Sequence, residues 1–229
     1  MVWQDAPLSL QNLPKIITAI GGLGTAAFGL VDASKVFWGG VNHIGFGKIA
    51  TTIRSLTPGS PTNALPQEKI LATLKANWFN GTDLASQKAV AKSLIKLNLS
   101  PSNAADLAKA TGLDSDVLVA VATKIMNADP KNPLVPSESD LYGRFDLAVT
   151  ALLDETYQFA DNLYCNWTRM IAAIVAVVLA IVGGLTINAD IWQCVIVGLL
   201  AIPLAPIAKD LSTAIATAVN TMQAVKKPS

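Results

Sequence analysis

Charged residues are scarce in this chain of 229 residues. Asp, Glu, Lys and Arg make up 14% of the sequence and hydrophobic residues make up 52%, whereas an ordinary soluble domain carries about 25% charged residues. The 17 basic and 16 acidic residues leave a formal net charge of +1, so there is no global field to attract nucleic acid or an acidic surface. The composition favours a membrane protein and argues against a nucleic-acid partner.

Histidine and cysteine are also few. His43 is the only histidine, which excludes a His-based catalytic triad or a multi-histidine metal site within one chain. The two cysteines, Cys165 and Cys194, are too few and too far apart in the sequence to indicate a disulfide framework or a metal centre. We expect both to be free thiols, and we predict no bound metal, no cofactor and no small-molecule substrate.

Motifs that would indicate catalysis or nucleic-acid binding are incomplete. The glycines within 21–24 lie in an apolar run and lack the Gly-Lys-Ser/Thr that completes a phosphate-binding loop. The carboxylates within 140–161 lack the spacing of a calcium-binding loop. Segment 105–118 has the spacing of a helix-turn-helix, but its second helix offers only Lys124 to the phosphates of DNA. We therefore expect no catalytic residues, and the sequence predicts that the protein is not an enzyme.

The sequence does contain long apolar runs. Residues 170–187 and 191–208 are each free of charge over eighteen residues, and only Asn188, Ala189 and Asp190 separate them. As a helix, each run would be about 27 Å long, close to the ~30 Å hydrocarbon core of a bilayer. This is the strongest pattern in the chain, and it predicts a transmembrane helical hairpin over 170–208.

A shorter apolar run covers 16–31, between Lys15 and Asp32. It would be about 24 Å long as a helix, and its glycines suit close helix packing in lipid better than an exposed helix in water. We predict a membrane helix that is retained, because the residues before it lack the basic start of a signal peptide. The alternative is a buried glycine-rich segment of a soluble fold. The predicted helix-packing residues here and in the hairpin are Gly22, Ala26, Gly29, Gly183, Gly184 and Gly198.

Aromatic and basic residues flank the apolar runs, as is usual where a helix meets the headgroup layer. Segment 33–53 mixes both kinds and is predicted to lie at the membrane interface. Arg169 and Lys209 flank the hairpin and its turn carries only Asp190, so the positive-inside tendency places the turn outside and 32–169 in the cytoplasm. The short loops are compatible with a bacterial inner membrane. The predicted interface anchors are Phe37, Trp38, Tyr164, Trp167, Arg169, Trp192 and Lys209.

Helix caps and breaks indicate a small helical domain in the middle of the chain. Thr82 or Asp83, Ser100 and Asp114 are placed to open helices, and Gly112 is placed to end one. After a proline-rich linker, a long helix is expected with one apolar face formed by Leu141, Phe145, Val149, Leu152, Phe159 and Leu163.

The predicted fold class is all-α and integral to a membrane, with a helical soluble domain between an N-terminal transmembrane helix and the C-terminal hairpin. The predicted parts are an N-terminal membrane helix with its interfacial segment (1–56), a helical cytoplasmic domain (57–135), an amphipathic stalk helix (136–169), the hairpin (170–208) and an amphipathic C-terminal helix (209–229).

Packing faces are abundant in this sequence and catalytic motifs are missing from it. This combination predicts a non-enzymatic structural or anchoring subunit of a membrane-bound assembly, whose helical domain docks a partner or another copy of itself. The expected partners are the lipid bilayer and the other subunits of a homo-oligomer or a larger complex. The alternative is a pore- or channel-forming protein, such as a toxin or a defence effector, in which several copies of the hairpin insert into a membrane.

Overall fold

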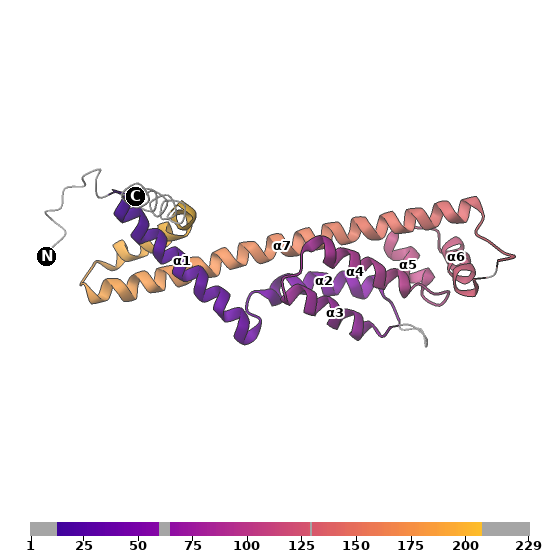
Figure 1. The fold of residues 1–229 in the computed structure, drawn as a ribbon, viewed down its shortest axis with the longest axis horizontal. Coiled ribbons are helices and arrows are strands. Elements are labelled where there is room, and N and C mark those ends of the chain that lie inside the picture. The colour runs from indigo at the N-terminus through magenta and orange to yellow at the C-terminus, as the bar shows by residue number, and fades with distance from the viewer. Residues whose placement is uncertain (1–12, 60–64, 129, 208–229) are drawn as a thin grey trace, which may run out of the picture. The chain divides into compact units, whose positions relative to one another are not determined.

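The structure is a computed structural model that describes residues 13–59, 65–128 and 130–207, with the side chains of 13, 14 and 36–38 left undescribed (Figure 1). The described part of the chain is helical and contains no strand, so the prediction of an all-α fold is confirmed. The labelled helices are α1 (Leu13–Trp38), α2 (Asn42–Leu56), α3 (Gln67–Phe79), α4 (Leu84–Leu97), α5 (Ala104–Thr111), α6 (Ser115–Asn127) and α7 (Pro136–Thr186). A further helix, Ile191–Ile207, follows α7, and we call it the second limb.

The chain forms two compact units. Unit 1 combines residues 1–40 with 165–229, and unit 2 consists of residues 41–164. The boundary at 164 falls inside α7, which is one continuous helix. The structure thus divides the chain differently from the sequence pattern, because α2 and most of the predicted stalk over 136–169 belong to unit 2 and help to form its core.

Large apolar side chains fill the core of unit 2. Helices α2 to α5 pack against one another and α6 packs on α5, and in Figure 1 helices α2 to α5 lie along the unit 2 part of α7. The buried positions recur three or four residues apart, as in helices that bury one face and expose the other to water. The largest fully buried side chains of this core are Ile49, Ile53, Leu56, Ile70, Leu74, Ile95, Leu107, Leu118, Phe145, Leu153 and Tyr157.

Several helix ends in unit 2 follow from the predicted local signals. The Asp83 carboxylate accepts a hydrogen bond from the Ser86 N–H at 2.8 Å, and the Asp114 carboxylate accepts one from the Val117 N–H at 3.0 Å. Both bonds satisfy a donor that would otherwise be unpaired at a helix N-terminus. Gly112 ends α5 in the left-handed region, at φ 70°. The predicted caps at these positions are confirmed.

The predicted helix start at Ser100 is wrong, because α5 begins at Ala104. The side chain of Asn103 accepts a hydrogen bond from the Ser100 N–H at 2.8 Å and donates one to the Asn98 carbonyl at 2.7 Å. These bonds hold residues 100–103 as a turn, so the serine that resembled a cap lies one turn before the helix.

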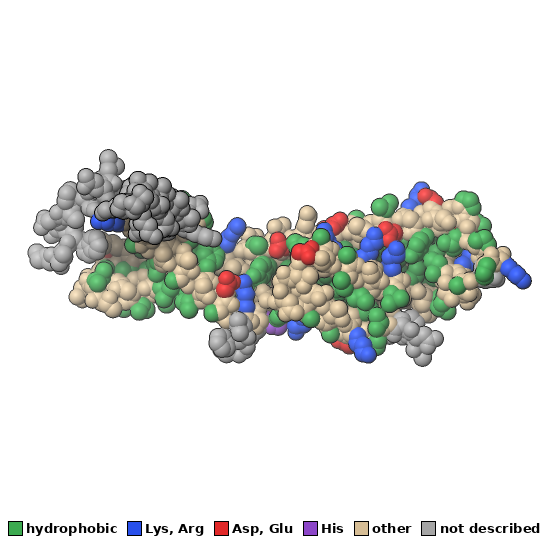
Figure 2. Space-filling view, in the orientation of Figure 1, with side chains coloured by type: hydrophobic (Ala, Val, Ile, Leu, Met, Phe, Trp, Pro, Cys, Tyr) green, Lys and Arg blue, Asp and Glu red, His purple; other side chains and the backbone are tan. Residues whose placement is uncertain are grey.

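Ion pairs connect α4 to the unit 2 part of α7. The Lys92 and Lys96 ammonium groups lie 2.6 and 2.9 Å from the Asp146 carboxylate. The Lys88 ammonium lies 2.5 Å from the Asp154 carboxylate. Hydrogen bonds from Lys92 and Lys96 hold the pKa of Asp146 below its ordinary value. On the face shown in Figure 2, acidic and basic side chains gather over unit 2.

Candidate functional site

Unit 1 contains the apolar helices that the sequence predicts. Two described helices, α1 over 15–35 and α7, are long and apolar enough to cross a membrane, and the second limb is a shorter apolar helix. Only 22% of the most apolar window in each long helix is buried. The core helix of a water-soluble protein is largely buried, so the exposure of these windows requires an explanation.

Small residues form the interior of unit 1. Ala27 of α1, Ala176 of α7 and Ala201 of the second limb are fully buried and make one cluster. Larger apolar side chains only border this cluster and stay partly exposed, among them Leu23 and Leu179. Buried alanines let helix backbones approach closely, which is the usual packing mode of helices in lipid.

Among the described residues of unit 1, Gly24, Gly184 and Gly198 lie where a side chain would not fit. A Cβ on Gly24 would stand 2.1 Å from the backbone oxygen of Ala201. A Cβ on Gly198 would stand 2.5 Å from the Cα of Val177, and one on Gly184 would stand 2.1 Å from the Cys194 sulfur. The structure therefore places Gly184 and Gly198, two of the predicted packing residues, at helix contacts within unit 1.

The other predicted packing residues are exposed. Gly22, Gly29 and Gly183 have nothing within 4 Å of a Cβ placed on them, and Ala26 is exposed as well. The buried stripe of α1 is instead formed by Gly21, Gly24, Ala27 and Val31. Packing at Gly22, Ala26 and Gly29 would need a surface beyond the described fold, and it stays a prediction.

Large apolar side chains cover the outside of unit 1. Ile174 and Val182 of α7 are each 58% exposed, and Trp192 of the second limb is 74% exposed. Because the exposed positions on α7 recur every three or four residues, they form a continuous stripe along one face of the helix. This stripe consists of Met170, Ile174, Val178, Val182 and Leu185.

The predicted interface anchors that the structure describes are divided between the two units. Tyr164 belongs to unit 2, where its ring packs edge-on against that of Trp78 with centroids 6.1 Å apart. Trp167, Arg169 and Trp192 are exposed residues of unit 1. The side chains of Phe37 and Trp38, at the end of α1, and all of Lys209 lie outside what the structure describes.

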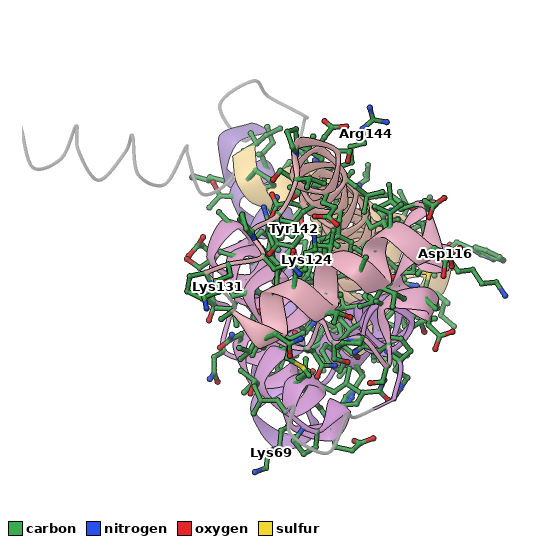
Figure 3. All side chains as sticks on the ribbon, turned by 90° about the vertical axis from the view of Figure 1, so that its right-hand side faces the viewer. Lys69, Asp116, Lys124, Lys131, Tyr142 and Arg144 are labelled. Carbon is green, nitrogen blue, oxygen red and sulfur yellow. The ribbon has the colours of Figure 1, made fainter. Side chains whose placement is uncertain are left out.

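Several charged side chains of unit 2 pair with one another. These residues contain no group of three or more His, Cys, Asp or Glu side chains placed to hold a metal ion, and Cys165 and Cys194 are free. A shallow hollow on unit 2 is lined by Lys96 and Asp146, which pair with each other, and by Arg144 and Asp140, which pair at 3.0 Å. Figure 3 looks onto this end of the unit and shows Arg144 projecting away from it.

No family model, curated protein or solved structure matches this chain.

Proposed function

We propose that the protein is a non-enzymatic structural or anchoring subunit of a membrane-bound assembly. In this proposal unit 1 lies in the lipid bilayer, and unit 2 is a cytoplasmic helical domain that docks a partner or another copy of the chain. The observation that carries the proposal is the opposite packing of the two units. Unit 2 has large apolar side chains inside, whereas unit 1 has alanine and glycine inside and large apolar side chains outside.

The free energy of hydration supports a lipid environment for unit 1. Complete transfer of a Val-, Leu- or Ile-sized side chain out of water is worth about 1.5–3 kcal/mol. Most exposed apolar side chains of the second limb and of the unit 1 part of α7 are about half exposed. Their combined gain on entering hydrocarbon is then on the order of 10 kcal/mol, comparable to the whole net stability of a typical domain.

The proposed orientation follows from charge. Arg169 precedes the first apolar run of the hairpin and Asp190 lies in its turn, so the positive-inside tendency favours a turn on the outer side of a bacterial inner membrane. The docking role of unit 2 is supported by large apolar side chains that its described surface leaves exposed, such as Leu97, Met126 and Leu147.

Cysteine labelling tests the anchoring and the orientation together. In a background of Cys165→Ser and Cys194→Ser, Ile187→Cys marks the exposed hairpin turn and Lys109→Cys marks the exposed surface of unit 2. We expect a membrane-impermeant maleimide to label Ile187→Cys in intact spheroplasts and Lys109→Cys only after permeabilisation. Equal labelling of both positions before permeabilisation, or release of the chain by alkaline carbonate, would contradict the proposal.

Purification in mild detergent tests the subunit role. A stoichiometric companion or a defined homo-oligomer is expected to co-purify with the tagged chain. A lone monomer that nevertheless stays in carbonate-washed membranes would contradict the subunit role, and conductance in planar bilayers would then decide for a pore.

A further inference from the structure

One end of unit 2 carries both points where the chain passes between the units. Unit 2 begins at Val41 and ends at Tyr164. A Cβ on Gly45 of α2 would lie 2.9 Å from the carbonyl oxygen of Ala160, and the Thr156 hydroxyl donates a hydrogen bond to Thr52 at 3.0 Å. Residue numbers thus rise along α2 as they fall along α7. The two helices are antiparallel, and the start of α2 lies beside residues 160–164.

The end of α3 joins the same place and brings aromatic rings with it. The Trp78 indole N–H donates a hydrogen bond to the carbonyl of Asn42 at 2.9 Å. The next residue, Phe79, lies edge-on to His43 with ring centroids 4.9 Å apart and to Phe46 at 6.5 Å. Together with the Trp78–Tyr164 pair, these contacts form a ring cluster drawn from α2, α3 and α7.

Two lysines lie over rings at this end. The Lys75 ammonium is 5.3 Å from the centroid of Phe79, and the Lys48 ammonium is 5.5 Å from the centroid of Phe159. Both lysines are exposed, and Phe159 is 51% exposed. Cation–π contacts hold these ammonium groups beside apolar surface while leaving them accessible to an anion.

These two lysines differ from the lysines of α4 and α6. Four others pair with carboxylates, at distances of 2.5 to 2.9 Å, namely Lys88, Lys92, Lys96 and Lys124. Among the described residues, no carboxylate lies within ion-pair distance of Lys48 or Lys75. The acidic residues of this part of α7 are Glu155, which is exposed, and Asp161, which is half-buried. The described side chains thus leave both ammonium groups uncompensated.

We propose that Lys48 and Lys75, with the rings of Phe79 and Phe159, form a collar that binds the phosphodiester headgroups of anionic phospholipids. This inference rests on the proposed function, because it requires the chain to leave unit 2 for a bilayer at this end. The exposed ring of Phe159 and the partly buried ring of Phe79, each beside a cation, suit the headgroup layer, where rings meet apolar surface and cations meet phosphate. The collar would orient unit 2 on the membrane surface and make its docking depend on lipid charge.

The test compares lipid retention by the full chain in nanodiscs of phosphatidylcholine mixed with phosphatidylglycerol. Native mass spectrometry after release gives the preference for phosphatidylglycerol over phosphatidylcholine. A lysine near an anionic surface is worth about fivefold in binding, so Lys48→Gln with Lys75→Gln should lower the preference about twenty-five-fold.

Two matched double variants serve as controls. Lys69→Gln with Lys109→Gln removes the same charge from exposed positions of α3 and α5, and Figure 3 shows Lys69 pointing away from the unit. This variant should keep the wild-type preference. Lys48→Arg with Lys75→Arg preserves the charge and the ring contacts, and it should keep the preference as well.

The outcomes separate the collar from the membrane anchor. The collar proposal is contradicted if the Lys48/Lys75 glutamine variant retains phosphatidylglycerol as the wild type does. It is also contradicted if both glutamine variants lose phosphatidylglycerol equally. Neither outcome affects the proposed membrane anchoring, which resistance to carbonate tests separately. If carbonate extracts the wild type itself, the proposed function fails first. Displacement of phosphatidylglycerol by inorganic phosphate alone would show a free-anion site and would overturn the lipid assignment.

Discussion

Gly24 of α1 lies directly against the backbone of Ala201, because a Cβ at position 24 would stand 2.1 Å from the Ala201 carbonyl oxygen. A carbonyl held in a helix cannot move aside as the end of a flexible side chain can, so any larger residue would push the two helices apart. Gly22, two residues earlier on the same helix, has nothing within 4 Å of a Cβ placed on it. Alanine substitutions at the two positions therefore distinguish the effect of steric contact from the effect of helix propensity.

Gly24→Ala should destabilise unit 1, by about 1–3 kcal/mol as expected for overpacking. Both Gly24→Ala and Gly22→Ala gain helix propensity of up to about 1 kcal/mol, so the difference between the two variants reports the contact. The measurement is the free energy of unfolding of the full chain in mixed detergent micelles. Equal stability of the two variants would show that α1 and the second limb do not pack through Gly24.

The parts of the fold that the sequence predicts are those with local signals. The caps at Asp83 and Asp114 and the stop at Gly112 act within one turn of their own helix, so spacing alone identifies them. The turn of the hairpin also depends on a local signal. Asn188 has a positive φ of 54°, which asparagine tolerates better than most residues do. Such features need no knowledge of the rest of the chain.

The parts that the sequence does not predict depend on distant contacts. Nothing local marks the unit boundary inside α7, because the helix runs through it without a break. The predicted apolar face of α7 includes Phe159, yet Phe159 is 51% exposed while Tyr157 and Ala160 are buried. The ring cluster joins three helices separated by many residues, so no spacing rule could have assembled it.

Tyr157→Phe should leave unit 2 equally stable or stabilise it by about 1 kcal/mol. The Tyr157 hydroxyl is buried without a hydrogen-bond partner among the described residues, and an unsatisfied buried polar group carries a desolvation cost. Chemical denaturation of the full chain gives the free energy of unfolding. A loss of more than about 1 kcal/mol would mean that the hydroxyl has a partner.

Alkaline pH supplies a second measurement on the same variant. Burial raises the pKa of Tyr157 from 10.0 to about 12. Above pH 10 the unfolded chain therefore loses the phenolic proton before the folded chain does, which favours unfolding. The wild type should lose stability between pH 10 and 12 more steeply than Tyr157→Phe, because the variant lacks this contribution. Identical slopes would contradict the burial of the phenol.

Asp146→Asn should destabilise unit 2 by about 0.5–1 kcal/mol near neutral pH, since the Asp146 carboxylate pairs with two lysines of α4. The pKa of Asp146 is lowered by these hydrogen bonds, so its contribution is present above the ordinary value of 3.8 and is lost as the pH falls through the lowered pKa. Urea unfolding should show the gap between wild type and variant closing in strong acid.

Asp140→Asn is the matched control for this prediction. Asp140 and Arg144 form an ion pair at 3.0 Å whose side chains are 67% and 69% exposed, and such exposed pairs contribute little. Its effect should stay below about 0.5 kcal/mol at every pH. A larger effect for Asp140→Asn than for Asp146→Asn would contradict the role of the α4–α7 ion pairs.

The membrane assignment of unit 1 can be tested within α7 itself, because this helix exposes large apolar residues in both units. Val178 in unit 1 is 53% exposed and Leu147 in unit 2 is 70% exposed. In water, a lysine at either position would be harmless, since an exposed apolar side chain has no packing to lose. In lipid, a lysine near the middle of a span costs about 2.5–3.5 kcal/mol of insertion free energy. Val178→Lys should therefore reduce the carbonate-resistant fraction, while Leu147→Lys leaves it unchanged. Equal behaviour of the two variants would contradict the placement of unit 1 in a bilayer.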